Sequence, residues 1–228
     1  MTRQSKSQGF TIIELMLAMS FVALLLLAIA MVTMQIGHIY NKGMTLRQVN
    51  QAGRAVTDEL QRTIAANKPF STTSHFINQN NLGGRLCVGD YTYVWNKGAA
   101  LVSETGVQNT YSDDSEKQIL LVKVSDSGAT LCADLNKKVD QSLATELLDS
   151  GDRDLVVHDF IVTETDRHPI SGQALYAISL TLGTNDQDEL ILDELTCQPP
   201  SGSSGGSDYC AVNRFDILAR AGNKTGRR

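Results

Sequence analysis

The first 68 residues contain no proline, and Pro69 is the first of only four prolines in this chain of 228 residues. Proline removes a helical hydrogen bond and kinks or ends an α-helix, so nothing of this kind interrupts the stretch. Its later part also has one helical face of apolar or small residues, at Val49, Ala52, Val56, Leu60 and Ile64. We therefore expect a helix from Phe10 to about Asn67, although two helices joined by a hinge near Gly37 or Gly43 are an open alternative.

Catalytic and metal-binding motifs are missing as well. The histidines occur in no H-E-x-x-H or other metal-ligand spacing, and there is no G-x-S-x-G or phosphate loop. No two of the four cysteines have the C-x-x-C spacing of many zinc and redox sites. We expect a protein that is not an enzyme and that needs no cofactor.

Two acidic stretches carry the oxygen ligands that Ca²⁺ prefers. DSGDRD contains Asp149, Asp152 and Asp154, and NDQDE contains Asp186 and Asp188. Neither stretch has the spacing of an EF-hand loop. We interpret both as solvated surface loops, with calcium binding as the alternative.

Charge is almost absent from residues 8–34, where the only ionisable side chain is Glu14. From Leu15 to Met34 the only polar residues are Ser20 and Thr33, which matches the roughly 20 apolar residues of a membrane-spanning helix. This run is longer than the apolar core of about 7 to 15 residues in a secretory signal peptide, and no A-x-A-like cleavage site clearly closes it. We expect the segment to remain on the protein as a membrane anchor.

The charges that flank the anchor predict its orientation. Arg3 and Lys6 precede it and no acid occurs in residues 1–9, although Lys42 and Arg47 beyond it weaken the asymmetry. Because basic residues favour the cytoplasmic side, we place the N-terminus in the cytoplasm. Everything after about residue 37 is then exported, as in a single-pass membrane protein.

Export predicts that the four cysteines are paired, since an even number of cysteines in an oxidising compartment is typical of a disulfide framework. Four cysteines allow three connectivities. We favour Cys197 with Cys210, because the polar, turn-forming segment QPPSGSSGGSDY lies between them. A disulfide that closes such a short loop stabilises the folded state by roughly 3 kcal/mol, because it lowers the entropy of the unfolded chain. Cys87 and Cys132 remain as the second pair, on segments that we expect to be strands.

The sequence GFTIIELMLAMSFVALLLLAI, residues 9–29, resembles the N-terminus of the type IV pilin family. The resemblance implies that a prepilin peptidase removes a basic leader after Gly9 on the cytoplasmic face and methylates the new N-terminus, Phe10. It also implies that Glu14 pairs with the methylated amine of a neighbouring subunit during assembly. The chain departs from many members of the family by having no proline in the spanning helix, so the resemblance does not predict where that helix would unwind in a filament.

A role in pairing explains why a carboxylate is placed here. An ionisable group deep in hydrocarbon costs about 2.5 to 3.5 kcal/mol on insertion scales. An acid and an amine that are each unfavourable alone become tolerable as a pair. The alternative is that Glu14 only extends to the lipid headgroups.

After Gly83 the sequence changes to short β-rich runs separated by Gly, Asn, Asp and Ser. We expect antiparallel strands at RLCV, YTYVW, QILLVKV, ATLCA, LVVHDFIVTE, QALYAISLTL and RFDILAR. SDSG, before ATLCA, is expected to be a hairpin connection, and residues 137–148 a short helix because Val139, Leu143 and Leu147 recur every four positions. We assign Tyr91, Tyr93 and Trp95 to strand packing, with an aromatic contact face as the alternative.

Four regions follow from these patterns: a leader at 1–9, a transmembrane assembly helix at 10–36, an amphipathic helix at 37–68, and an exported β-rich head at 69–228 with a disulfide loop at 197–210. The expected fold is α+β and pilin-like, with a long N-terminal helix whose second half packs on an antiparallel β-sheet. The head resembles those of the larger minor pilins and of J-type minor pseudopilins.

The resemblance implies a minor pilin, a structural subunit of a filament of the kind used in adhesion and motility. The implied partners are the prepilin peptidase, other pilin subunits, an inner-membrane assembly platform and, before assembly, membrane lipid. The alternatives are a minor pseudopilin of a type II secretion or DNA-uptake system, a signal-anchored exported binding protein that does not polymerise, and an anchored hydrolase.

Net charge bears on nucleic-acid binding. Removal of residues 1–9 takes away Arg3 and Lys6 and leaves 18 basic against 25 acidic residues, a net charge of −7. Such a head repels nucleic acid, so we expect no nucleic-acid partner, and we interpret the basic end at Lys224, Arg227 and Arg228 as a solvated terminus.

Overall fold

The computed structural model describes residues 10–79, 82–102, 109–114, 117–148, 155–191, 194–198 and 209–222. It divides into two compact units, residues 1–41 and residues 42–228. Helix α1 (Ile12–Ala66) contributes its first part to one unit and its second part to the other.

Helix α1 extends over 55 residues, so the helix predicted from Phe10 to about Asn67 is present. Gly37 and Gly43 are both helical, and a Cβ atom added at either would meet no other atom within 4 Å. Its N-terminal portion is apolar enough to cross a membrane by length and hydropathy, with an 18-residue window of mean hydropathy 2.8.

The second part of α1 is amphipathic, as its sequence predicts. The stripe residues Val49, Val56, Leu60 and Ile64 are fully buried, and Ala52 packs beside them. Thr45, Gly53, Thr57 and Thr63 complete the buried face. This face belongs to the main hydrophobic core of the second unit, so packing rather than helix propensity stabilises this part of the helix.

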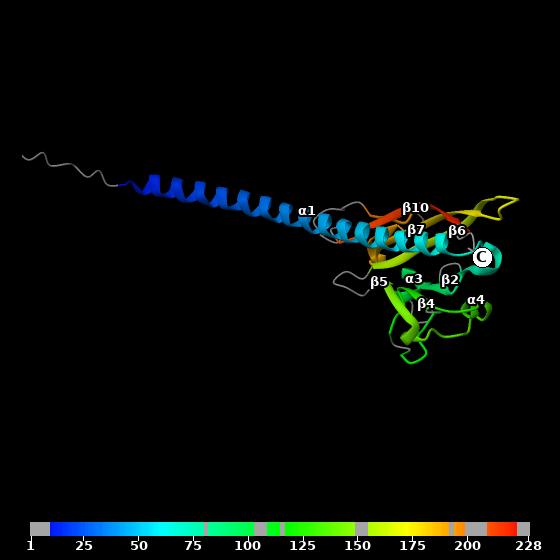
Figure 1. The fold of residues 1–228 in the computed structure, drawn as a ribbon. Coiled ribbons are helices and arrows are strands. Elements are labelled where there is room, and N and C mark those ends of the chain that lie inside the picture. The colour runs from blue at the N-terminus through cyan, green and yellow to red at the C-terminus, as the bar shows by residue number, and fades with distance from the viewer. Residues whose placement is uncertain are drawn as a thin grey trace, which may run out of the picture. The chain divides into compact units, whose positions relative to one another are not determined.

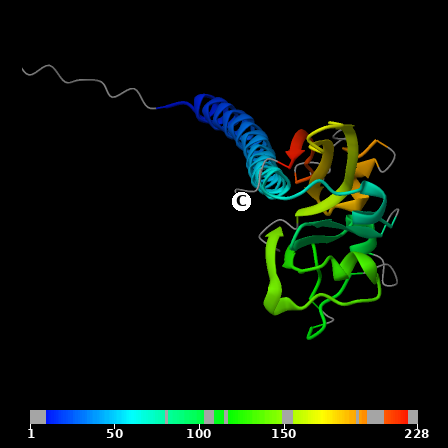
Figure 2. The ribbon, with the colours of Figure 1, turned by 45° about the vertical axis from the view of Figure 1, so that its right-hand side comes forward.

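The second unit contains two larger antiparallel sheets and a short two-stranded one, which Figures 1 and 2 show from two directions. The five-stranded sheet, teal to green in Figure 2, has the order β1 (Phe76–Asn78), β2 (Gly83–Val88), β3 (Tyr91–Asn96), β4 (Leu121–Ser125) and β5 (Ala144–Leu148). Each strand pairs with the strand next to it in sequence, so this sheet is a meander.

The three-stranded sheet has β7 (Ala174–Thr184) at its centre, between β6 (Leu155–Arg167) and β10 (Val212–Ala221). Its register shifts twice along β6, at His158 and at Thr165. The remaining strands, β8 (Leu190–Ile191) and β9 (Thr196–Cys197), pair with each other. The second part of α1 runs beside β10, where Gln61 Nε2 donates a hydrogen bond of 2.9 Å to the carbonyl oxygen of Leu218 (Figure 1).

Short helices lie before and between the strands: α2 (Thr72–His75), which precedes β1, then α3 (Gly98–Val102), α4 (Thr130–Ala133) and 3₁₀ turns at Gln141–Leu143 and Gln187–Glu189. Helix α4 corrects the prediction of a strand at ATLCA and, with it, of a hairpin at SDSG. The carboxylate of Asp126 accepts hydrogen bonds from the backbone nitrogens of Thr130 and Leu131 and from the Thr130 hydroxyl. These bonds hold the chain in a helical turn that strand propensity does not reveal.

The predicted helix at residues 137–148 is also wrong, because most of it is a 3₁₀ turn followed by β5. The three residues spaced by four do not share a face. Val139 is buried in a small second cluster with Tyr111, Leu143 is 50% exposed, and Leu147 packs against the main core. Pairing with β4, where Val122 lies opposite Glu146, fixes this segment as a strand.

Aromatic rings occupy the centre of the main core. Trp95 is fully buried, with its ring centroid 4.7 Å from that of Phe160 and 6.1 Å from that of Phe76. Tyr93 is fully buried too, which confirms the packing interpretation for both residues. Tyr91 remains partly exposed, with Lys123 Nζ 3.9 Å from its ring centroid, a cation–π contact.

Candidate functional site

The start of α1 is built by Thr11 and Glu14. Glu14 Oε2 accepts hydrogen bonds from the Thr11 backbone nitrogen at 2.9 Å and from the Thr11 hydroxyl at 2.8 Å. In return, the Glu14 backbone nitrogen donates to Thr11 Oγ1 at 3.3 Å. The spacing T-x-x-E and the reciprocal bonds make this a capping box, which satisfies donors that a helix leaves unpaired in its first turn.

The capping box leaves one side of the Glu14 carboxylate open. Both of its hydrogen bonds use Oε2, and Oε1 accepts none from the residues that the structure describes. The adjacent Phe10 is 80% exposed within the chain. The carboxylate can therefore hold its own helix end and accept a cation from outside the chain at the same time. Gly9, the other residue of the predicted cleavage site, lies outside the described residues.

The two polar side chains deeper in the apolar segment bond to their own backbone. Ser20 Oγ donates to the carbonyl oxygen of Leu17, and Thr33 Oγ1 donates to that of Ala30, each at 2.9 Å. Back-bonding of this kind lets a hydroxyl enter hydrocarbon without a lost hydrogen bond. Glu14 is thus the only ionisable side chain among residues 10–37, and the one with capacity for a charged partner.

Both expected disulfides are present, Cys87–Cys132 and Cys197–Cys210. The pairing is as predicted, although Cys132 lies in the helical turn α4 rather than in a strand. The first disulfide links β2 to α4, and the second links β9 to the residues that lead into β10. No free cysteine occurs in the chain, and both bonds fit a head that folds in an oxidising compartment.

Arg85 was not singled out by sequence patterns, yet it is 2% exposed and donates five hydrogen bonds. Nε donates to Asn109 Oδ1 at 2.9 Å. The two Nη atoms donate to the backbone carbonyls of Leu131, Asp134, Leu135 and Lys137 at 2.7 to 3.0 Å. Burial lowers the pKa of Arg85, with nearby Asp134 and Asp126 opposing the shift. The guanidinium therefore fastens the same segment that Cys132 ties to β2.

Two side chains fasten α1 to the five-stranded sheet. Lys123 Nζ lies 2.7 Å from Glu59 Oε1 and donates to Thr63 Oγ1 at 3.2 Å. The hydrogen bond from Lys123 is the main reason that the pKa of Glu59 is lowered. Glu59 and Lys123 also line a surface hollow of about 420 Å³, where their charges are paired with each other.

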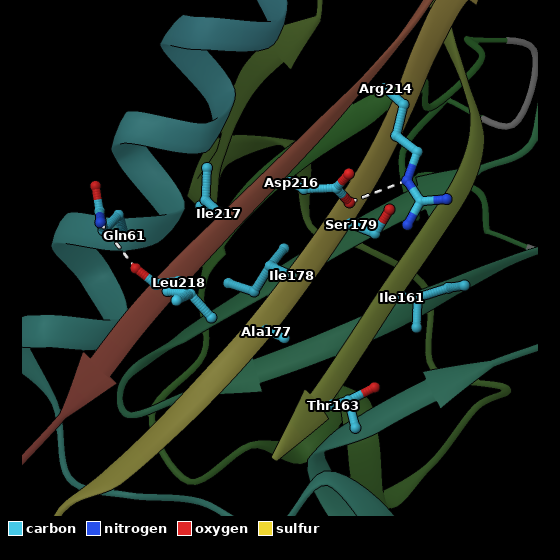
Figure 3. A pocket seen from close by; sticks show the side chains of 10 residues that line it. All are labelled: Gln61, Ile161, Thr163, Ala177, Ile178, Ser179, Arg214, Asp216, Ile217 and Leu218. Carbon is cyan, nitrogen blue, oxygen red and sulfur yellow. Dashed lines mark hydrogen bonds and ion pairs between the residues drawn. The ribbon is translucent and has the colours of Figure 1, made fainter. Parts of the chain in front are cut away.

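A surface hollow of about 660 Å³ lies on the three-stranded sheet, beside α1 (Figure 3). Ile161, Ala177 and Leu218 give it apolar walls, and Arg214 Nε lies 2.9 Å from Asp216 Oδ1 at its edge. Ser179 lies next to Asp216 and is the first cause of the lowered pKa of that carboxyl. None of the ten lining residues is a histidine, lysine or cysteine, and the one carboxylate among them, Asp216, is ion-paired with Arg214.

The other candidate ligands form no site in the part of the chain that the structure describes. His158 is buried, with Nε2 3.1 Å from the carbonyl oxygen of Thr184, and its pKa is lowered chiefly by that burial. Asp186 and Asp188 belong to no group of three or more possible metal ligands among the described residues. Asp149, Asp152 and Asp154 lie outside the described residues, as do Lys224, Arg227 and Arg228.

Comparisons of this chain with protein-family models, with curated proteins and with solved structures found no match.

Proposed function

We propose that this chain is a structural, non-enzymatic subunit, a minor pilin, of a type IV pilus-like filament. In this proposal a prepilin peptidase cleaves after Gly9 and methylates Phe10 on the cytoplasmic side. The apolar part of α1 holds the subunit in the membrane until an inner-membrane assembly platform transfers it to other pilin subunits. The head is exported, where its two disulfides form.

The observation that carries the proposal is the position of Glu14 in a capping box that leaves Oε1 open. The capping box accounts for the bonds of Oε2, whereas the open Oε1 leaves room for a partner from outside the chain. A carboxylate that receives the N-terminal amine of a neighbour needs a fixed position, because a buried ion pair is favourable only with good geometry and further hydrogen bonds. Thr11 supplies those bonds and orients the group.

The continuity of α1 supports the same function. One uninterrupted helix joins a segment of membrane-spanning hydropathy to a segment that forms part of the core of the head. Such a helix gives each subunit an apolar segment that can move from lipid into a bundle of neighbouring helices, since both surroundings are apolar.

The test of processing is the mass of the protein in filaments sheared from cells. We expect N-methyl-Phe10 as the N-terminus, and we expect Gly9→Leu to leave the uncleaved chain in the membrane fraction. A control substitution in the same leader, Gln8→Leu, should be processed normally. Filament-borne protein that begins at Met1 or Thr2 would overturn the proposal.

A further inference from the structure

Strand β5 forms an outer edge of the five-stranded sheet, at the end of the strand order (yellow-green in Figure 2). In the described part of the chain β5 pairs with β4 alone. By contrast, the edge of β10 contacts α1 through Gln61, and β1 contacts β6 through Asn78 and Phe160. The backbone N–H and C=O groups on the outer side of an edge strand can bond to a further strand, so β5 offers an open edge.

This edge lacks the features that usually prevent further pairing, such as lysine, proline or a bulge in the middle of the strand. The sequence of β5, ATELL, contains neither lysine nor proline. The register shift lies at Leu147, near the end of the strand, so residues 144–146 pair with β4 in a regular register. The only charged residue, Glu146, is ion-paired with Lys117. The strand is therefore able to accept a neighbour.

The hollow of about 420 Å³ opens beside the same strand. Thr145 and Leu147 line it from β5, and Ala55 and Glu59 line it from α1. Side chains that lie directly opposite each other on neighbouring strands point to the same face of a sheet. A residue beside Thr145 on an added strand would therefore point, like Thr145, toward this hollow.

One oxygen of Glu59 is open. Oε1 accepts hydrogen bonds from Lys123 Nζ at 2.7 Å and from the Thr63 hydroxyl at 3.2 Å, whereas Oε2 accepts none from the residues that the structure describes. The lining of the hollow is mixed, with apolar groups at Ala55 and Leu147. A lysine or arginine side chain fits such a lining, because its apolar stem can lie along the walls while its charged end bonds to a carboxylate.

We propose that the open edge of β5 receives an extended strand of another pilin subunit, which places a basic side chain in the hollow against Glu59. The proposal rests on the proposed filament function and names one contact of the head. Strand addition takes its affinity from backbone hydrogen bonds and its specificity from pockets for alternate side chains. Residues 69–228 contain 13 basic and 22 acidic residues, a net charge of −9, which also favours a basic partner segment.

A second copy of this chain does not supply such a strand. If β5 of a second copy were added to the edge, the side chains in the hollow would come from ATELL, which contains no basic residue. The open oxygen of Glu59 would then gain no counter-charge. The contact therefore joins unlike subunits, as a minor pilin among other pilin subunits requires.

The first experiment fills the hollow from within the chain. Thr145→Arg puts an arginine at an exposed position beside Glu59, so the amount of the subunit in sheared filaments should fall about tenfold. Processing to N-methyl-Phe10, both disulfides and the fluorescence of buried Trp95 should match wild type. Thr163→Arg is the matched control, because Thr163 is exposed on β6, and it should be incorporated normally. Undiminished incorporation of Thr145→Arg would overturn the proposal.

The second experiment separates the two members of the ion pair. Glu59→Gln and Lys123→Met break the same pair, so both should lower the stability of the second unit. Glu59→Gln should also lower incorporation about tenfold, because the basic side chain of the partner loses its counter-charge. Lys123→Met leaves the carboxylate for the partner and should be incorporated nearly as well as wild type. Equal incorporation of the two variants would overturn the role of Glu59.

Photo-crosslinking identifies the occupant of the edge. Glu146 is replaced by p-benzoylphenylalanine, because residue 146 lies on the face of β5 away from the hollow and leaves it free. In irradiated filaments, residue 146 should be joined to a non-helical segment of a different pilin subunit that contains lysine or arginine. A cross-link to a second copy of this chain, to lipid or to a helix of a neighbour would contradict the proposal, as would the absence of any cross-link.

Hydrogen exchange separates this proposal from the function on which it rests. Wild-type protein in sheared filaments establishes the function, and its absence from them would overturn that function. In such filaments the outward amides of Ala144–Leu148 should exchange at least about tenfold more slowly than in full-length protein in detergent, because they become hydrogen-bonded. Equal exchange rates in wild-type filaments and in detergent would overturn the strand addition and leave the function intact.

Discussion

The two units of this chain satisfy their polar groups in opposite ways. In residues 10–41, each polar side chain described above bonds within four positions, as Thr11 does with Glu14 and Ser20 with Leu17. In residues 42–228, the important polar contacts join positions far apart, such as Arg85 with Leu135 and Lys123 with Glu59. The first unit is therefore equipped to be a helix in any apolar surroundings, whereas the second depends on its own tertiary fold.

This difference predicts that substitutions in the second unit change its folding, whereas substitutions in the first unit leave that folding unaltered. Trp95 is the only tryptophan and is buried in the second unit, so its fluorescence reports the unfolding of that unit alone. Its fluorescence can be followed on full-length protein in detergent.

The largest effect is expected at Gly53, where α1 meets β10. A Cβ atom at Gly53 would lie 2.1 Å from the ring of Phe215, so a side chain here must displace the ring or the helix. Gly53→Val should lower the free energy of unfolding by about 3 kcal/mol, as overpacking of a core does. Gly43→Ala is the control in the same helix. The added methyl group at residue 43 meets no atom within 4 Å, and the substitution should raise the free energy of unfolding by about 0.5 to 1 kcal/mol. Equal effects of the two substitutions would contradict the packing of α1 on β10.

Removal of the buried guanidinium is expected to have the next largest effect. Arg85→Met leaves four backbone carbonyls and the Asn109 side chain without their donor, which should cost about 2 to 3 kcal/mol. Arg220→Met removes an exposed arginine and should change stability by less than about 0.5 kcal/mol. Chemical denaturation of both variants checks the difference. A stability of Arg85→Met within the error of wild type would show that the segment 131–137 does not depend on Arg85.

His158 makes the stability of the second unit depend on pH. Its pKa is lowered in the folded state from the ordinary value near 6.5, first by burial and also by Lys97. The unfolded chain therefore binds a proton that the folded chain does not, and stability falls as the pH decreases below about 6.5, until the folded-state pKa is passed. His158→Gln should flatten this part of the pH profile, whereas His168→Gln, at an exposed position, should not. An unchanged profile for His158→Gln would rule out this source of the pH dependence.

The smallest effect is expected in the first unit. Ser20→Ala removes a hydroxyl that bonds only to the carbonyl oxygen of Leu17 in its own helix. The change should leave Trp95-detected unfolding unaltered and membrane retention within about twofold of wild type. A clear loss of stability in the second unit would contradict the view that Ser20 acts only within its own helix.

The same difference explains what the sequence predicts well. Helix α1 and its buried stripe are predicted by local periodicity, and the pairing of Cys197 with Cys210 is predicted by the short polar loop between them. The structure confirms all three predictions. Strands with many β-branched and aromatic residues, such as β3 and β6, are confirmed for the same reason.

The failures lie where distant residues decide the local structure. Strand β5 depends on pairing with β4. Helix α4 is a different case, because the carboxylate of Asp126 that holds it is only four or five positions away, but strand propensity takes no account of such a side-chain bond. The five hydrogen bonds of Arg85 reach two segments that lie 24 to 52 positions after Arg85 in the chain, so no local sequence pattern predicts them. The capping box is the exception. Its signal, T-x-x-E before an apolar run, is local and present at residues 11–14, although the membrane cost of a charge predicts a role for Glu14 only.

Glu14→Gln tests the central claim most directly, because glutamine can keep the capping box while it removes the charge. We expect the variant to be cleaved after Gly9 and to fold with both disulfides and an unchanged Trp95 transition. Its ratio of filament to membrane protein, measured by quantitative mass spectrometry, should fall about tenfold or more, because the amine of the neighbouring subunit then has no counter-charge among packed helices. Thr11→Val, which weakens the cap but keeps the charge, should reduce the ratio less. Equal filament incorporation of Glu14→Gln and wild type would contradict the account.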